Sequence, residues 1–494
     1  MNNTIEQILG LLRYNPDQPL IFTDGFFLFL FLGFLIVYNM LKKRDVARIF
    51  FVILFSLYFY YKTSGLFVLL LIGVAVSDFV IAMFINDAKS QRNRKLLLLL
   101  SCCINLGLLC YFKYTNFFGM MIADLTGGHF EIKNIFLPIG ISFYIFQSMS
   151  YVIDIYRGNI KPLQLFVDYL FYVSFFPQLV AGPIVRARDF LPQILQKPVV
   201  SKEMFGEGVF LIIAGLFKKA VISDYISLNF VDRVFENPLL YSGFENLMGI
   251  WGYALQIYCD FSGYSDMAIG LALLLGFRFN RNFDSPYQSA TITEFWRRWH
   301  ISLSSWLKDY LYISLGGNRK GRLRTYVNLM ITMLLGGLWH GASWQFVLWG
   351  ALHGAALCLH KMAMKLFPSM KPFGDDMTPW RRVLGVFLTF NFVCLCWVFF
   401  RAESMDKAWF MLHRIFTDFQ WEVIPQFVTG YKWVFVMILF GYGLHAIPDS
   451  LQQKTLNMTI KSPMLYKVAI TVAVIWVIMQ LKSSEIQPFI YFQF

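Results

Sequence analysis

The fold is decided by residues 291–354, which read TITEFWRRWHISLSSWLKDYLYISLGGNRKGRLRTYVNLMITMLLGGLWHGASWQFVLWGALHG. This stretch places His300 beside arginines and tryptophans, and His340 inside an apolar segment that follows Arg324. A helix that starts near Thr325 and rises ~1.5 Å per residue brings His340 roughly 20 Å along its axis, well inside a hydrocarbon core of about 30 Å. An imidazole at that depth is costly to bury, so we expect it to face a bundle interior or a wet cavity.

Two interpretations of His340 are open. It is either a neutral histidine hydrogen-bonded between helices, as polar side chains in membrane bundles often are, or a functional group. Two glycines before it and one after it leave room beside the backbone, while Trp339 and Trp344 can line a cavity, which favours the functional interpretation. For His300, which follows two arginines by two and three positions, a place at the membrane interface is the simpler explanation.

The composition of the whole chain indicates a polytopic membrane protein. Of its 494 residues, 57% are hydrophobic and 18% aromatic, and only 15% are charged. The net charge of +13 comes from short basic clusters between apolar segments, at 42–44, 89–95, 218–219 and 319–324. Such clusters are typical of cytoplasmic loops, so we expect no nucleic-acid partner. The seven cysteines lack the spacing of a zinc site or a disulfide framework, and no metal is expected.

Apolar runs predict an all-α fold with about 11–14 membrane segments, some of them re-entrant. The runs cover residues 20–41, 46–61, 65–86, 96–114, 135–156, 203–222, 244–276, 345–363, 381–400, 431–447 and 466–481. The run 163–190 differs because it contains Pro177 and ends in Ala-Gly-Pro, which predicts a kinked helix or, as we favour, a re-entrant pair. No soluble linker or internal repeat interrupts the pattern, so residues 1–494 are predicted to form one integral-membrane domain.

Two further stretches allow alternative interpretations. Asp260 and Asp266 lie with several hydroxyl side chains in an apolar context, where they either line a cavity or pair with basic groups of a cytoplasmic loop. The chain ends in QPFIYFQF at residues 487–494. Aromatic residues at a membrane end commonly form an interfacial belt, but a short apolar tail can also be threaded into a cavity.

The stretch 294–318, EFWRRWHISLSSWLKDYLYISLGGN, and the GGLWHGASW at 336–344 resemble the membrane-bound O-acyltransferase family. The resemblance is to its bacterial branch, which includes the membrane subunit of alginate O-acetylation, its cellulose and peptidoglycan counterparts and the D-alanyl transferase of teichoic acids. QLVAGPIVR (178–186) and QIYCDFSGYSDMAIG (256–270) resemble the same branch. The resemblance implies a ring of tilted helices around a thinned core, with a funnel that reaches the catalytic histidine from the cytoplasmic side. By motif, this histidine corresponds to His340 and the family's second histidine to His300.

The aromatic tail at 489–494 carries a second resemblance. Phe489, Tyr491 and Phe494 reproduce the F-x-Y-x-x-F pattern that ends the small accessory membrane protein of teichoic acid D-alanylation, where the tyrosine is thought to carry the acyl group. Several polysaccharide acetylation members of the family carry a similar tail on the transferase itself. The tail therefore argues against D-alanyl transfer by this chain.

The resemblance implies a membrane-bound O-acetyltransferase, a multi-pass protein of the bacterial cytoplasmic (inner) membrane. It would pass acetyl groups from cytoplasmic acetyl-CoA across that membrane to an extracytoplasmic partner similar to the SGNH acetyltransferases. The end product would be an O-acetylated exported polysaccharide, such as alginate, cellulose or peptidoglycan. We expect acetyl-CoA as the acyl donor, lipid around the protein and no permanently bound cofactor.

The expected catalytic residues are His340, His300 and Tyr491. Neutral His340 would take the proton from a hydroxyl that adds to the thioester carbon, and His300 would orient the substrate or act as the first base. Tyr491 would be the attacking nucleophile. Its acetyl ester would pass the acetyl group onward readily, because a phenol is a better leaving group than an alkyl alcohol; alternatively, the tail only docks a partner. The expected substrate-binding residues are Trp339, Gly337, Trp299, Arg319, Arg322 and Arg324, of which the arginines attract the coenzyme's phosphates or serve only as a topology signal.

Other functions remain as alternatives. The chain could transfer D-alanyl or another acyl group to an envelope polymer, or acylate a lipid or a secreted protein. From a different class, it could be a membrane transporter whose histidines form a proton relay. The sequence lacks the two similar halves that inverted-repeat carriers show, which disfavours the transporter.

Overall fold

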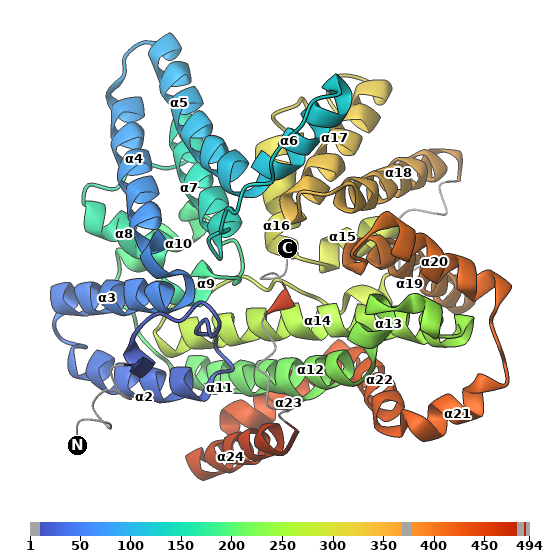
Figure 1. Cartoon of the computed structure of the whole chain (residues 1–494). Helices are drawn as coiled ribbons and strands as arrows, with labels where there is room; N and C mark the ends of the chain where they lie inside the picture. Colours follow the sequence, from blue (N-terminus) through green and yellow to red (C-terminus); the bar gives the residue numbers. More distant parts are fainter. Residues whose placement is uncertain (1–9, 368–377, 482–488, 491–494) are drawn as a thin grey trace. The chain divides into compact units, whose positions relative to one another are not determined.

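The computed structural model describes residues 10–367, 378–481 and 489–490. All regular secondary structure in these ranges is helical, which confirms the predicted all-α class (Figure 1). The chain divides into two compact units. The N-terminal unit comprises Met1–Gly208 and Met267–Asn280, and the C-terminal unit comprises Val209–Asp266 and Arg281–Phe494.

Several helices have the length and composition of membrane spans. Within the described ranges, four helical stretches are long and apolar enough to cross a membrane, namely Asp45–Asp87, Gln91–Thr126, Trp344–Leu366 and Pro379–Arg401. Two bent pairs pass the same test, Val423–Gly430 with Lys432–His445 at 87° and Asp449–Lys461 with Met464–Gln480 at 118°. The predicted run 244–276 forms the long helix α14 (Gly243–Leu274), which carries several polar residues, and the remaining predicted segments are shorter or broken helices. The chain is thus a polytopic membrane protein whose spans include bent pairs.

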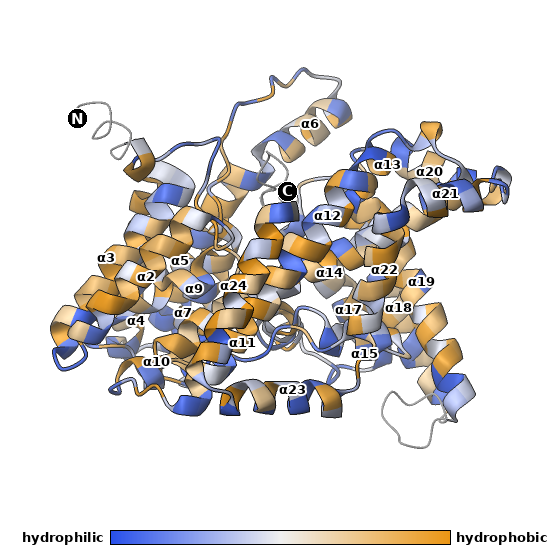
Figure 2. Cartoon of the chain, turned by 90° about the horizontal axis from the view of Figure 1, so that it is seen from below, coloured by the Kyte–Doolittle hydropathy of each residue, from blue (hydrophilic) through white to orange (hydrophobic). Residues whose placement is uncertain are grey.

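The N-terminal unit begins with long apolar helices: α2 (Gly25–Met40), α3 (Asp45–Ser64), α4 (Val68–Asp87), α5 (Gln91–Leu109), α6 (Thr115–Thr126) and α7 (Ile141–Tyr156). Helices α2 and α3 are mostly apolar along their length (Figure 2), whereas α5 has a basic first turn followed by an apolar run. Helix α2 is shorter than the predicted run 20–41, because the Asp24 carboxylate accepts a hydrogen bond from the Phe26 amide and caps the helix there. Inside the unit, the ring of Phe176 contacts those of Phe27, Phe31, Phe34, Phe55 and Phe59.

The run 163–190 is broken, as its Pro177 and Ala-Gly-Pro sequence predicted. It forms α8 (Phe166–Ser174), the single turn α9 (Phe176–Leu179) and, after a non-helical stretch, α10 (Ala187–Ile194). Residues 171–187 are all buried, so protein covers the backbone groups that the breaks release from helical hydrogen bonding. Gly182 has to be a glycine, because a Cβ there would lie 2.5 Å from the Cα of Gln178. The position of this segment relative to a membrane stays a prediction.

The C-terminal unit holds the stretch with both predicted histidines. Its helices are α12 (Asp224–Ile226), α13 (Asp232–Glu236), most of α14 (Gly243–Leu274), α15 (Ile292–Arg298), α16 (Ile301–Trp306), α17 (Arg322–His340), α18 (Trp344–Leu366), α19 (Pro379–Arg401), α20 (Met405–Thr417), α21 (Val423–Gly430), α22 (Lys432–His445), α23 (Asp449–Lys461) and α24 (Met464–Leu481). Helix α11 (Lys202–Leu216) leads into the unit. The Trp344 side chain, predicted to line a cavity, is 58% exposed at the start of α18.

Helices α17 and α18 approach each other at two glycines. A Cβ on Gly337 would lie 2.2 Å from the carbonyl oxygen of Phe346, and one on Gly350 would lie 2.4 Å from that of Met333. Because neither backbone oxygen can rotate away, both positions require glycine. The close approach fixes the last turn of α17, at whose end His340 lies.

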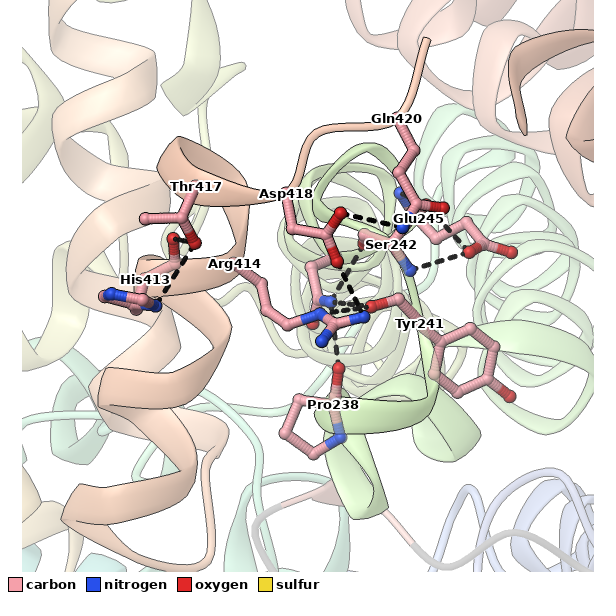
Figure 3. Close-up of polar contacts among 10 residues, drawn as sticks. Pro238, Tyr241, Ser242, Glu245, His413, Arg414, Thr417, Asp418 and Gln420 are labelled. Carbon is pink, nitrogen blue, oxygen red and sulfur yellow. Dashed lines mark hydrogen bonds and ion pairs between the residues drawn. The ribbon is translucent and has the colours of Figure 1, made fainter. Parts of the chain in front are cut away.

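The N-terminus of α14 is tied to the end of α20 (Figure 3). Ser242 and Glu245 form a reciprocal capping box, in which the Glu245 carboxylate accepts from the Ser242 amide (2.9 Å) and the Ser242 hydroxyl accepts from the Glu245 amide (3.3 Å). The Arg414 guanidinium donates to the Tyr241 carbonyl (3.1 Å) and pairs with Asp418 (2.9 Å). These contacts orient α14, which carries Asp260 and Phe261 further along its length.

The basic pair Lys218 and Lys219 lies in the π-helical turn η3 (Phe217–Ser223), not in a loop. The Lys219 side chain is 4% exposed and its ammonium lies 2.5 Å from an Asp260 oxygen, while Lys218 pairs with Asp266. The predicted cytoplasmic loop at 218–219 is therefore wrong. Of the two alternatives for Asp260 and Asp266, pairing with basic groups is confirmed, although the partners are helical. The partners are distant in sequence, so no local pattern indicates the pairing.

Candidate active site

His340 ends α17 inside an aromatic enclosure. The imidazole is 4% exposed, and its ring centroid lies 5.0 Å from Trp339, 5.0 Å from Trp349 and 5.1 Å from Phe400. These three rings come from α17, α18 and α19, so residues distant in sequence build the enclosure. Aromatic walls exclude water and leave the histidine as a polar group in an apolar setting.

His300 lies at the junction of α15 and α16 with a left-handed backbone. It is fully buried, and its φ of 41° and ψ of 56° belong to a region that non-glycine residues rarely adopt. Such a conformation costs ~1–3 kcal/mol and persists only where the surroundings enforce it. Here the amide of Ile301 donates to the carbonyl of Asn282 (2.8 Å), which fixes the turn. A strained backbone at a buried histidine is typical of a functional position.

The side chain of Asn282 determines which nitrogen of His300 carries the proton. Asn282 Oδ1 accepts from the backbone amide of Ser302 (3.1 Å), and its Nδ2 donates to Ser265 (3.0 Å), so the orientation of the amide group is unambiguous. The same Oδ1 lies 3.2 Å from His300 Nδ1. An oxygen acceptor at that distance requires a proton on Nδ1, which leaves the lone pair on Nε2. His300 is therefore oriented to accept a proton through Nε2.

Trp339 lies between the two histidines. Its ring centroid is 6.1 Å from that of His300 and 5.0 Å from that of His340. His300, Trp339 and His340, which the sequence analysis singled out as site residues, thus gather in one buried cluster of the C-terminal unit. We call this cluster, together with Asn282, the histidine pocket.

Comparison with known proteins assigns the chain to a family. Residues 154–399, which include the histidine pocket, match the model of the membrane-bound O-acyltransferase family. The probable alginate O-acetylase of Pseudomonas aeruginosa is 40% identical over 415 residues, which are 82% of this chain and 76% of that protein. The chain belongs to the membrane-bound O-acyltransferase family. The resemblance and the enzyme class predicted from sequence are confirmed: the chain is an O-acyltransferase, and the transporter alternative is not supported.

Two other relatives mark the breadth of this O-acyltransferase family. The peptidoglycan O-acetyltransferase of Helicobacter pylori is 37% identical over 437 residues, covering 82% of this chain and 80% of that protein. The teichoic acid D-alanyltransferase of Bacillus subtilis is 26% identical over 289 residues, covering 56% and 71%. Both O-acetylating relatives are thus more similar to this chain than the D-alanylating one.

The two described residues of the tail of this O-acyltransferase lie in the protein interior. Tyr491 and Phe494 lie outside the described residues, but Phe489 and Ile490 are described, and they are 1% and 3% exposed. The ring of Phe489 lies 5.6 Å from that of Phe261, which lies 4.6 Å from His300. For residues 489–490 the interfacial belt is wrong, and insertion into the protein is confirmed.

The remaining predicted binding residues have varied surroundings. Trp299 packs behind the pocket, 5.1 Å from Phe283 and 5.0 Å from Trp397. Gly337 is required for the contact between α17 and α18. Three predicted binding residues lie at or just before the start of α17, namely Arg319, Arg322 and Arg324. They are exposed and pair with no acidic group within the described ranges. At ~1.5 Å per residue, the 19-residue helix α17 separates this end from His340 by roughly 27 Å.

Sequence reasoning missed three residues in or beside the histidine pocket. Asn282 has no sequence signal of its own, since a single asparagine after an arginine is common in loops. Trp349 stands out only once α18 is seen to pack on α17. His353 could have been found by the criterion applied to His340, because it also lies in an apolar run. It is fully buried, its Nδ1 accepts from Trp296 Nε1 (3.3 Å), and its ring lies 4.7 Å from Trp349.

Proposed function

We propose that this O-acyltransferase takes acetyl groups from cytoplasmic acetyl-CoA and passes them across the bacterial cytoplasmic membrane for O-acetylation of an exported polysaccharide. The observation that carries the proposal is the gathering of His300, Trp339 and His340 in one buried cluster. An acetyl group attached to a coenzyme on one side and needed on the other requires a transfer site inside the membrane protein. The relatives named for alginate and peptidoglycan O-acetylation support acetyl over D-alanyl as the group.

In the proposed first step, a hydroxyl oxygen adds to the thioester carbon of acetyl-CoA. Neutral His340 takes the hydroxyl proton, the C–O bond forms, the C–S bond breaks, and the proton passes from His340 to the leaving thiolate of the coenzyme. His300, with Nδ1 bound to Asn282 and its lone pair on Nε2, orients the substrate or removes the first proton. Trp339 contacts both histidines and would hold the acetyl group in place, with Trp299 supporting the pocket from behind.

The proposed nucleophile is Tyr491, the residue that follows the buried Ile490. Its phenol ester would be activated toward a second transfer, because a phenol is a better leaving group than an alkyl alcohol. The acetyl group would then pass to a serine of an extracytoplasmic partner of the SGNH type, which modifies the polymer. The exposed Arg319, Arg322 and Arg324 are proposed to attract the phosphates of the coenzyme at the cytoplasmic face.

The test is to incubate the purified protein with radiolabelled acetyl-CoA, digest it and locate the label by mass spectrometry. We expect label on Tyr491 in the wild type and none in His340→Ala. His413→Ala, which removes an exposed histidine of α20, is the matched control and should label normally. Acetyl-CoA consumption that requires an added partner and leaves Tyr491 unlabelled would replace the relay by direct transfer. Full activity in His340→Ala would refute the base assignment, and labelling only from an alanyl donor would refute acetyl transfer.

A further inference from the structure

Ile490, near the C-terminus, is held through its backbone. The amide nitrogen of Ile490 donates a hydrogen bond to Asp260 Oδ2 at 3.0 Å, and Asp260 is only 2% exposed. The next residue back, Phe489, packs its ring 4.8 Å from Tyr264, one turn further along α14. A hydrogen bond to a charged acceptor in a buried place is among the stronger ones in proteins. Asp260 and Tyr264 together form a site on α14, which we call the seat. The seat therefore binds the chain through the backbone N–H of residue 490 and the ring of residue 489.

Lys219 pairs with this acceptor and orients it. Its ammonium lies 2.5 Å from Asp260 Oδ1 and 2.7 Å from Asp224 Oδ1. The two oxygens of Asp260 thus have different partners, a lysine on one side and the tail on the other. Each partner satisfies one side of a carboxylate that burial would otherwise leave exposed to an apolar surrounding.

The seat adjoins the histidine pocket through one aromatic ring. Phe261 follows Asp260 in α14, and its ring lies 5.6 Å from Phe489 on one side and 4.6 Å from His300 on the other. When the tail is bound to Asp260, the ring of Phe261 therefore connects Phe489 with His300. The Nε2 lone pair of His300 faces away from Asn282. A tail released from Asp260 would lose this placement, although the histidines would stay where they are.

We propose that Asp260, held by Lys219, is the positioning residue that seats the C-terminal segment of the chain beside the histidine pocket. The inference rests on the proposed function in one respect, because acyl transfer is the reason why the segment has to lie near the pocket. The binding of the segment to Asp260 does not depend on which group is transferred. Because the contact uses the backbone N–H of residue 490, the seat tolerates a change of side chain there and does not tolerate loss of the N–H.

The experiment measures seating directly, with the full chain in detergent and a nitroxide on Gln493→Cys after replacement of the seven native cysteines. The spectrum reports the fraction of label that moves freely. Proline has no backbone N–H, so Ile490→Pro removes the donor without touching the ion pair, whereas Ile490→Val keeps the donor. Asp260→Ala removes the acceptor, and Asp224→Asn perturbs Lys219 from its other side without contacting the tail.

We expect Ile490→Pro and Asp260→Ala to raise the ratio of mobile to immobile label about tenfold, the effect of losing one charge-assisted hydrogen bond. Ile490→Val and Asp224→Asn should stay within about twofold of wild type. In the acetyl transfer assay, Ile490→Pro should lower kcat and leave the KM for acetyl-CoA unchanged. A merely structural role of residue 490 would not separate kcat from KM in this way.

Two results would overturn the proposal. One is an unchanged spectrum in Ile490→Pro, which would show that the N–H does not hold the tail. The other is a release in Asp224→Asn equal to that in Asp260→Ala, which would show that loss of any charge in the cluster has the same effect. Absence of label on Tyr491 would refute the relay but leave these spectra unaffected, so the two proposals fail independently.

Discussion

Substitution of Gly337 by alanine tests how the contact between α17 and α18 maintains the pocket. The new Cβ would lie 2.2 Å from the Phe346 carbonyl oxygen, more than 1 Å inside van der Waals contact. Because this oxygen belongs to the backbone of α18, only a separation of the two helices relieves the clash. Overpacking of this kind costs ~1–3 kcal/mol, against ~1 kcal/mol that alanine gains over glycine in a helix interior.

The neighbouring Gly336 provides the matched control. Its added Cβ would meet only the Leu307 Cδ1 atom, at 3.2 Å, and that end of a leucine can rotate away. We therefore expect Gly336→Ala to be neutral or stabilising by up to ~1 kcal/mol, while Gly337→Ala is destabilised by a net ~0–2 kcal/mol, so that the two variants differ by ~1–3 kcal/mol, or roughly 1–3 °C in Tm for a chain of this length. Thermal unfolding in detergent, followed by tryptophan fluorescence, measures the difference.

Activity should follow the same order, because Gly337 lies one turn before His340 and its displacement moves the imidazole among Trp339, Trp349 and Phe400. We expect Gly337→Ala to lose at least about tenfold in kcat even well below its Tm, since a misplacement of ~1 Å can cost about a hundredfold. Equal stability and equal activity of the two alanine variants would refute the assignment of Gly337 to the helix contact.

Three further changes test other parts of the site. Asn282→Ala removes the acceptor that holds the proton on His300 Nδ1, so kcat should fall about 10- to 100-fold, as it does when groups that orient a ligating histidine are removed, and its pH profile should change. An unchanged pH profile would contradict the tautomer argument. Lys219→Met leaves buried Asp260 uncompensated and should destabilise the protein by ~3–5 kcal/mol in thermal unfolding. Stability should recover when Asp224→Asn and Asp260→Asn are added, whereas a stable single variant would rule out a buried charge. Replacing Arg319, Arg322 and Arg324 by alanine should raise the KM for acetyl-CoA about tenfold at low salt, and the difference from wild type should shrink at high salt, where exposed charges are screened; an unchanged KM would remove the phosphate role.

Much of the architecture followed from local sequence. The runs 345–363 and 381–400 correspond to α18 (Trp344–Leu366) and α19 (Pro379–Arg401), because the length and continuity of an apolar run are sufficient to predict a buried or spanning helix. The break near Pro177 was visible for the same reason, since proline cannot continue a helical hydrogen-bond ladder. Helix boundaries differ by a few residues from the prediction: α17 begins at Arg322, three residues before the predicted Thr325.

By itself, the sequence determined the membrane class, the O-acyltransferase family and the two histidines, because each depends on residue types within short stretches. Only the tertiary structure decided how those histidines are held. Asn282 and His300 are 18 positions apart, and Ile490 and Asp260 are 230 apart. A lysine such as Lys219 has the same local pattern in a cytoplasmic loop as in a buried ion pair, and its environment is set by the acids that folding brings beside it. Orientation, pairing and burial are properties of such long-range contacts, which no local periodicity contains.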